Sequence, residues 1–130
     1  MSYGRAVLME GSVEEIMPKV EEALRSQGFG VLTRIDVKAT LKEELGEDVA
    51  PYVILGACNP RLAHRALTAD PGIGLLLPCN VVVREHETGK IEVAAIDPQV
   101  MGEMTGHPAV AAVADEATRL LEAALDQLSM

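Results

Sequence analysis

The chain has 130 residues and a net charge of −9, from 20 acidic and 11 basic residues. This length is enough for one domain with its own hydrophobic core. The excess negative charge disfavours nucleic acids and anionic membrane surfaces as partners, because both present phosphate groups. The aromatic residues are Tyr3, Phe29 and Tyr52, which offer no platform for stacking bases.

The sequence contains no apolar signal core and no apolar run of about 18 residues. We therefore expect a cytoplasmic protein with no membrane partner. Two cysteines do not make a disulfide framework, and in a reducing compartment we expect free thiols.

Residues 3–9 are typical of a first strand. Ser12 and Glu15 form a capping box, and apolar residues then recur at helical spacing as far as Gln27. Pro18 lies inside this predicted helix, where it favours a kink or a late start.

Residues 29–37 indicate a second strand with one face formed by Val31, Thr33, Ile35 and Val37. Thr40 is predicted to cap a short helix that continues to Leu45 and is closed by Gly46. Residues 52–58 are almost wholly apolar, which is typical of a strand buried on both faces.

Asn59 and Pro60 are predicted to open the next helix, as its N-cap and first residue, and residues 70–72 to end it. Residues 79–86 and 91–96 are predicted to form a hairpin with a turn at 87–90. Pro108 then opens a last helix whose core-facing stripe would be Val110, Val113, Ala117, Leu120, Ala124 and Leu128.

The element order is roughly βαβαβαββα, which predicts a single two-layer α+β domain over residues 1–130. Strands that are apolar on both faces need cover on both sides, and one layer of helices covers only one. We therefore expect a homodimer that associates through the sheet. The alternative is a second helix layer within one subunit.

The two cysteines and two asparagines of the chain form two Cys-Asn pairs, Cys58-Asn59 and Cys79-Asn80. Each pair adjoins an apolar strand, so neighbouring strands would bring both pairs to one pocket for a small molecule. Asn59 has a predicted task as a helix cap. Asn80 has none, which makes its amide the stronger candidate for contacting a ligand. The remaining candidate binding residues are Asp36 and His64.

Four segments, residues 28–32, 35–41, 52–60 and 74–83, together resemble the bacterial and archaeal domain-of-unknown-function family numbered 302. The resemblance covers nearly the whole chain, although Pro18 departs from the family pattern. It implies a compact α+β domain with a mainly antiparallel sheet and a dimer-forming fold. It implies no activity, cofactor or catalytic residue, so no functional residue is carried over.

Two alternatives to a binding module remain. A thiol-dependent enzyme or redox sensor would use Cys58 or Cys79, with His64 as base and Asp36 or Asp97 to orient it. Cys58 precedes a helix amino terminus, which favours a thiolate, whereas the simpler interpretation of both cysteines is burial. The other alternative is a purely structural dimerisation domain.

We expect no metal and no cofactor. The cysteines with His64, His86 and His107 would supply a Cys2His2 set, but the close ligand spacing of structural zinc sites is lacking. Arg34 and Arg84 are cations on predicted strands. Directed into a pocket they would attract an anion, whereas facing solvent they would form ion pairs.

Overall fold

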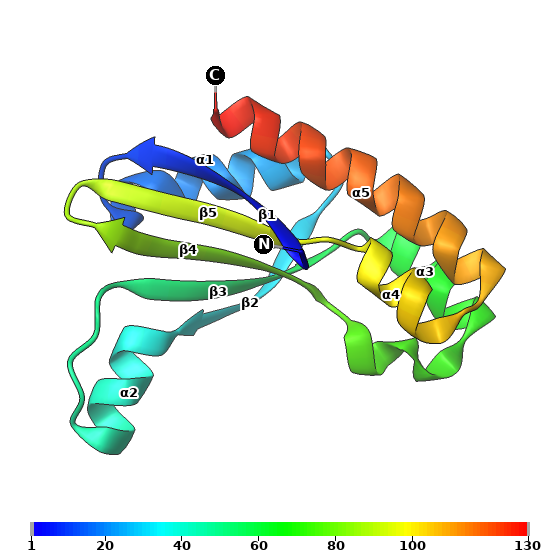
Figure 1. Cartoon of the computed structure of the whole chain (residues 1–130), viewed down its shortest axis with the longest axis horizontal. Helices are drawn as coiled ribbons and strands as arrows, with labels where there is room; N and C mark the ends of the chain where they lie inside the picture. The colour runs from blue at the N-terminus through cyan, green and yellow to red at the C-terminus, as the bar shows by residue number, and fades with distance from the viewer. Residues whose placement is uncertain (1, 130) are drawn as a thin grey trace.

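The computed structural model describes residues 2–129, which form one sheet and a set of helices (Figure 1). Along the chain the elements are β1 Gly4–Glu10, α1 Val13–Ser26, β2 Gly30–Asp36, α2 Val37–Leu45, β3 Tyr52–Cys58, α3 Pro60–Ala69, η1 (a 3₁₀ helix) Pro71–Leu76, β4 Cys79–Glu87, β5 Lys90–Ile96, α4 Gln99–Thr105 and α5 Pro108–Leu128. The predicted α+β class and element order are confirmed, with η1 and α4 as additions. None of these helices is long and apolar enough to span a bilayer.

The strands form one antiparallel sheet in the order β1-β5-β4-β3-β2. β4 and β5 are joined by a tight turn at Thr88 and Gly89, and the φ of 81° at Gly89 is one that glycine adopts without strain. β3 and β4 are antiparallel neighbours, with Cys58 at the end of one and Cys79 at the start of the other. The two cysteines therefore lie at the same end of the sheet.

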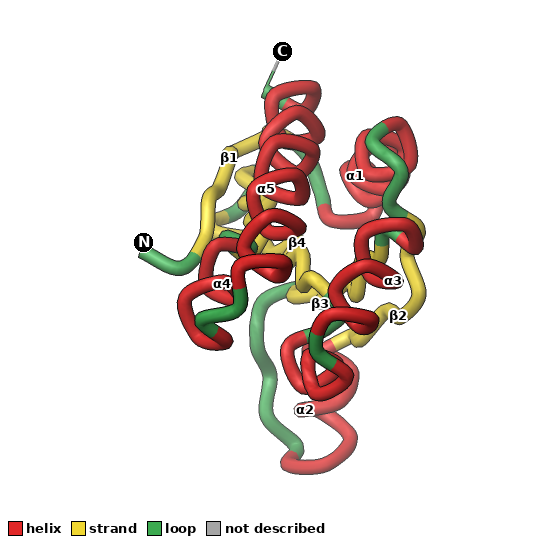
Figure 2. The backbone as a smooth tube through the Cα atoms, turned by 90° about the vertical axis from the view of Figure 1, so that its right-hand side faces the viewer, coloured by secondary structure: helices red, strands yellow, loops and turns green. Residues whose placement is uncertain are grey.

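Helices α1 and α5 lie side by side over one face of the sheet (Figures 1 and 2). Between them and the strands is an aliphatic core, in line with the aromatic-poor sequence. Its centre consists of side chains that are at most 1% exposed, namely Ile16, Val20, Leu55, Val81, Val83, Ile91, Val93 and Val110. Each of these contributes about 1.5–3 kcal/mol by leaving water. The predicted stripe of the last helix faces this core, with Leu120 and Leu128 partly buried at its edge.

The opposite face of the sheet carries no helix layer within residues 2–129. Directly paired residues share a face, so the register gathers on this side Ala6, Leu8, Ile35, Ile54, Val82 and Ala94. Leu8 is 59% exposed and Ile35 48%. We call this surface the open sheet face. β3 is thus only half-buried at Tyr52 and Ile54, in contrast to the predicted burial on both faces.

Helix α1 begins immediately after its predicted cap. The Ser12 hydroxyl oxygen accepts the Glu15 N–H at 3.2 Å and donates to the Glu15 carboxylate at 3.1 Å. The helix then runs through Pro18 to Ser26, so the predicted late start is wrong. Met17 and Val20, on the core-facing side of the helix near Pro18, are buried, and their packing outweighs one lost backbone hydrogen bond.

A bulge divides β2. Val31 pairs with Ala57, but Thr33 pairs with Gly56, so the register shifts at Leu32. Val31 consequently faces the helices, while Thr33 faces the open side. The predicted single-faced stripe on this strand is wrong, because one extra residue reverses the alternation.

The short helix α2 starts earlier than predicted. The Asp36 carboxylate, rather than Thr40, caps it by accepting the Ala39 N–H at 2.9 Å. Its predicted end is confirmed, since Gly46 adopts the left-handed conformation with a φ of 67°.

Helix α3, η1, α4 and the first half of α5 gather at the end of the sheet that carries the cysteines (Figure 2). Pro60 is the first residue of α3, as predicted, and the His107 ring nitrogen Nδ1 accepts the Ala109 N–H to cap α5. These helices extend beyond the strand ends and enclose the site described next.

Candidate functional site

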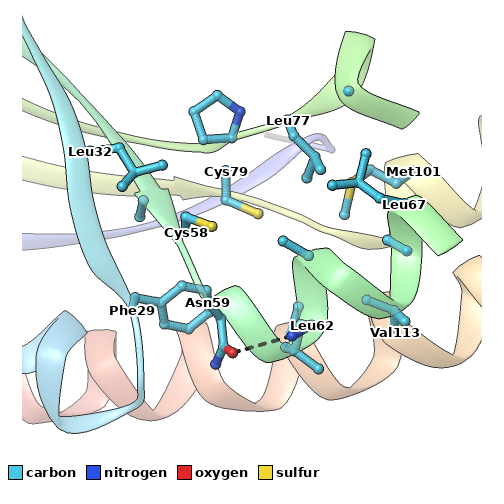
Figure 3. A pocket seen from close by; sticks show the side chains of 16 residues that line it. Phe29, Leu32, Cys58, Asn59, Leu62, Leu67, Leu77, Cys79, Met101 and Val113 are labelled. Carbon is cyan, nitrogen blue, oxygen red and sulfur yellow. Dashed lines mark hydrogen bonds between the residues drawn. The ribbon is translucent and has the colours of Figure 1, made fainter. Parts of the chain in front are cut away.

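A cavity of about 280 Å³ lies where β3 ends and β4 begins (Figure 3). Its wall is drawn from the start of β2, the strand ends, α3, η1, α4 and α5. The hydrocarbon part of this wall consists of Phe29, Leu32, Ala57, Leu62, Ala63, Ala66, Leu67, Leu77, Pro78, Val113 and Ala117. The peptide bond between Leu77 and Pro78 is cis.

Both cysteines are in this wall as free thiols, with their sulfur atoms on the same side of the cavity (Figure 3). The strand register explains why the two cysteines are close: Cys79 of β4 pairs with Ala57 of β3, and Cys58 is the residue after Ala57. Cys79 is 7% exposed, and burial, with a smaller effect of Cys58, raises the pKa of its thiol to about 11. Cys79 is therefore a neutral thiol near pH 7, not a thiolate nucleophile.

Asn59 is 8% exposed and both ends of its amide are used. Its Oδ1 accepts the Leu62 N–H at 3.4 Å, which caps α3 as predicted. Its Nδ2 donates to the Gln27 carbonyl at 3.4 Å and so links the cap to the turn before β2. Asn59 holds the cavity wall together.

The other three candidate residues lie outside the cavity wall. Asn80 is exposed and pairs with Gly56, so strand alternation turns it to the face opposite Cys79. Asp36 caps α2 at the far end of β2. His64 is on the exposed side of α3. The structure thus brings together Cys58, Asn59 and Cys79, and it separates them from Asn80, Asp36 and His64.

The proposed cysteine–histidine chemistry finds little support in this geometry. The wall contains no histidine and no carboxylate, so no general base adjoins either thiol. Among residues 2–129, no three side chains of His, Cys, Asp or Glu are placed to share a metal ion.

The two strand cations are also used elsewhere. Arg34 forms an ion pair with Glu21 of α1 and borders a separate, open groove of about 670 Å³ beside that helix. Arg84 is on the open sheet face, where its Nε and one terminal nitrogen each donate to Glu92 at 3.2 Å. Neither arginine brings a positive charge to the cavity.

Sequence reasoning missed two wall elements, η1, which contributes Gly74, and α4, which contributes Met101. The start of α4 carries a local signal. The Asp97 carboxylate accepts the Gln99 N–H at 3.0 Å at the start of this helix, so Asp97-Pro98 was an available start signal. The two methionines give no further helical signal, because Met101 is 4% exposed and Met104 is 67% exposed.

These features define a two-layer α+β domain with an apolar cavity at one end of its sheet. A family model described as "Domain of unknown function DUF302" matches residues 5–128, and the chain belongs to this family. It is similar to the crystal structure of the uncharacterized conserved protein DUF302 from Bacillus stearothermophilus, with a TM-score of 0.89 and 32% identity over 98% of this chain and 99% of that one. No curated protein matches the chain.

Proposed function

We propose that this protein is a dimeric small-ligand-binding module whose ligand occupies the cavity beside Cys58, Asn59 and Cys79. The observation that carries this proposal is the cavity itself. Protein interiors contain few voids larger than a water molecule, and small-molecule sites begin at about 300 Å³. A cavity of about 280 Å³ is close to that size, and its wall is almost wholly hydrocarbon.

The way the cavity is built supports a binding role over packing alone. Four helices and three strand ends converge on it, and the buried amide of Asn59 links the start of α3 to the turn before β2. A domain that served dimerisation alone would gain stability by filling this space with larger side chains. Several wall positions are alanines, such as Ala63 and Ala66, which leave the space open.

The open sheet face supports the dimeric part of the proposal. It offers contiguous apolar side chains around Leu8, Ile54 and Val82, with the paired charges of Arg84 and Glu92 beside them. A two-fold contact buries identical patches against each other, so one apolar face is sufficient to make both halves of the interface.

The test is a fragment screen observed by protein NMR, with side-chain methyl groups assigned. We expect hits that shift the methyl signals of Ala57, Ala63 and Ala66 while leaving those of the open sheet face unchanged. Extraction of natively purified protein with organic solvent, followed by mass spectrometry, would identify a co-purified ligand. A broad screen in which no compound perturbs the cavity methyl groups would overturn the binding function.

A further inference from the structure

The chemistry of the cavity wall restricts the class of molecule that fits it. Apart from two thiols, the Met101 thioether and the Asn59 amide, its side chains are hydrocarbon (Figure 3). No lysine, arginine, aspartate, glutamate or histidine belongs to the wall. A charged ligand group placed inside would therefore lose its hydration without gaining a partner.

The one amide in the wall is already satisfied. Both ends of Asn59 are hydrogen-bonded to backbone groups, of Leu62 and Gln27. Within residues 2–129 no buried side-chain nitrogen or oxygen lacks a partner. The wall therefore presents no unpartnered buried side-chain nitrogen or oxygen to a polar ligand atom, in contrast to sites built to recognise a hydroxyl or amide. The thiols are weak hydrogen-bond donors, and Cys79 remains uncharged because burial raises its pKa.

The arginines that adjoin wall residues in the sequence form ion pairs with a glutamate outside the wall. Arg61 and Arg65 are on α3, and both form ion pairs with Glu116 of α5. This arrangement leaves no free cation of α3 to receive a carboxylate or phosphate.

The rim of the cavity is apolar as well. Leu32 at the bulge of β2 is 67% exposed, and Leu67 on α3 is 41% exposed. Both also belong to the wall, and they lie at opposite sides of it in Figure 3. Exposed leucines at a cavity entrance provide further apolar surface for the part of a ligand that extends outward.

From these observations we infer that the cavity binds an uncharged apolar molecule, an alkyl chain or a small ring system, through burial rather than through hydrogen bonds. This inference rests on the proposed binding function and specifies its ligand class. The volume agrees with it, since an engineered apolar cavity of roughly 150 Å³ holds benzene. The present cavity of about 280 Å³ has room for a group of nearly twice that size.

The first test compares three ligands with the same alkyl chain: 1-octanol, octanoate and octylammonium, titrated by NMR at physiological salt. We expect 1-octanol to shift the cavity methyl groups with an affinity at least about tenfold higher than either ion, because burying a charge is costly. Among longer and shorter n-alcohols, affinity should rise about fourfold per methylene until the cavity is full. Equal or tighter binding of octanoate at the cavity would overturn the inferred ligand class.

The second test alters the cavity. Ala63→Leu places a larger side chain in the wall and so reduces the cavity volume. The affinity for n-alcohols should then stop rising at a shorter chain length than in the wild type. Ala39→Leu, the same change on the exposed surface of α2, should leave the series unchanged. Leu67→Lys at the rim should raise the affinity of octanoate relative to 1-octanol, a readout that loss of folding would not produce. An unchanged series in folded Ala63→Leu protein would contradict the inference.

The outcomes separate this inference from the proposed function. Polar fragments that bind at the cavity, together with no response to any n-alcohol, would refute the apolar ligand class and leave the binding function standing. If neither polar fragments nor alcohols perturb the cavity methyl groups, both the inference and the function fail.

Discussion

The hydroxyl of Thr33 lies directly over Gly56 on the neighbouring strand, so close that a Cβ on Gly56 would be 2.2 Å from Thr33 Oγ1. The same Cβ would be 2.8 Å from Cγ of Pro78, a residue of the cavity wall. Gly56 is therefore needed for the close approach of β2, β3 and the start of β4. We expect Gly56→Ala to lower the free energy of unfolding by about 1–3 kcal/mol, measured by chemical denaturation.

The matched control for this substitution is Gly30→Ala. Gly30 is on β2 and pairs with Cys58 of β3, and a Cβ at this position would have only the Cys58 carbonyl oxygen nearby, at 4.0 Å. It should be neutral or slightly stabilising, because alanine restricts the unfolded chain. Adding Thr33→Ala to Gly56→Ala should restore part of the lost stability, because it removes the clash with the Thr33 hydroxyl. The recovery should be incomplete, because the close contact with Pro78 remains. A Gly56→Ala protein as stable as the wild type would contradict the packing described.

The two asparagines should differ sharply when each is replaced by alanine. Asn59→Ala removes the cap of α3 and the hydrogen bond to Gln27, and we expect a loss of about 1–2 kcal/mol in unfolding free energy. Asn80→Ala should change it by less than about 0.5 kcal/mol, because no hydrogen bond among the described residues involves its exposed side chain. Thermal and denaturant unfolding of both variants would check this contrast, and equal losses would refute the separate roles.

Much of the fold could be predicted because local signals agreed with the tertiary structure. Asn59-Pro60 marked the start of α3, and the apolar run of residues 52–58 marked β3 to within its observed bounds. The bulge at Leu32 could not be foreseen, because the pairing of Thr33 with Gly56 depends on a neighbouring strand and leaves no signal in the local sequence. The start of α2 was missed for a related reason: Asp36 and Thr40 are both acceptable caps, and only the end of β2 selects between them.

The candidate site was predicted in part for similar reasons. The two Cys-Asn pairs drew attention to the strand ends that border the cavity, because antiparallel neighbours bring Cys58 and Cys79 together. The same logic failed to place Asn80, whose side chain follows the alternation of β4 to the other face. The wall contribution of α4 depends on helix packing beyond the sheet, which a segment of seven residues does not reveal.

The buried thiol of Cys79 should make stability sensitive to alkaline pH. Burial raises its pKa from 9.0 to about 11 in the folded protein. Below pH 9 the thiol is protonated in both the folded and the unfolded state, so it causes no change of stability with pH in that range. Between the two values the unfolded chain loses its proton first, and stability falls by up to about 3 kcal/mol as pH rises through 11.

Denaturation of the wild type and of Cys79→Ala at about pH 8 and about pH 10.5 would measure this effect. The variant should lose less stability over this interval, because it lacks the thiol, while groups such as tyrosines and lysines titrate in both proteins. Cys58→Ala should keep most of the wild-type loss, since burial is the main cause and Cys58 the smaller one. Parallel alkaline losses in the wild type and Cys79→Ala would show that Cys79 is not buried as described.

The proposed dimer through the open sheet face predicts a substitution that should make the protein monomeric. Val82 lies at its centre, paired with Ile54 on one side and Ala94 on the other. In an isolated subunit a side chain at this position points to solvent, so Val82→Glu should fold. In a dimer built on this face, two carboxylates would be buried near the two-fold axis without partners, at a cost of several kcal/mol.

Sedimentation velocity at micromolar concentration should therefore show a dimer for the wild type and a monomer for Val82→Glu. Leu75→Glu is the control, because Leu75 is 92% exposed on η1, away from the sheet, and this variant should remain dimeric. A monomeric wild type would refute the dimer itself. A Val82→Glu protein that stays dimeric would instead assign the interface to another surface, because two unpaired carboxylates at the centre of a sheet-to-sheet contact are incompatible with that contact.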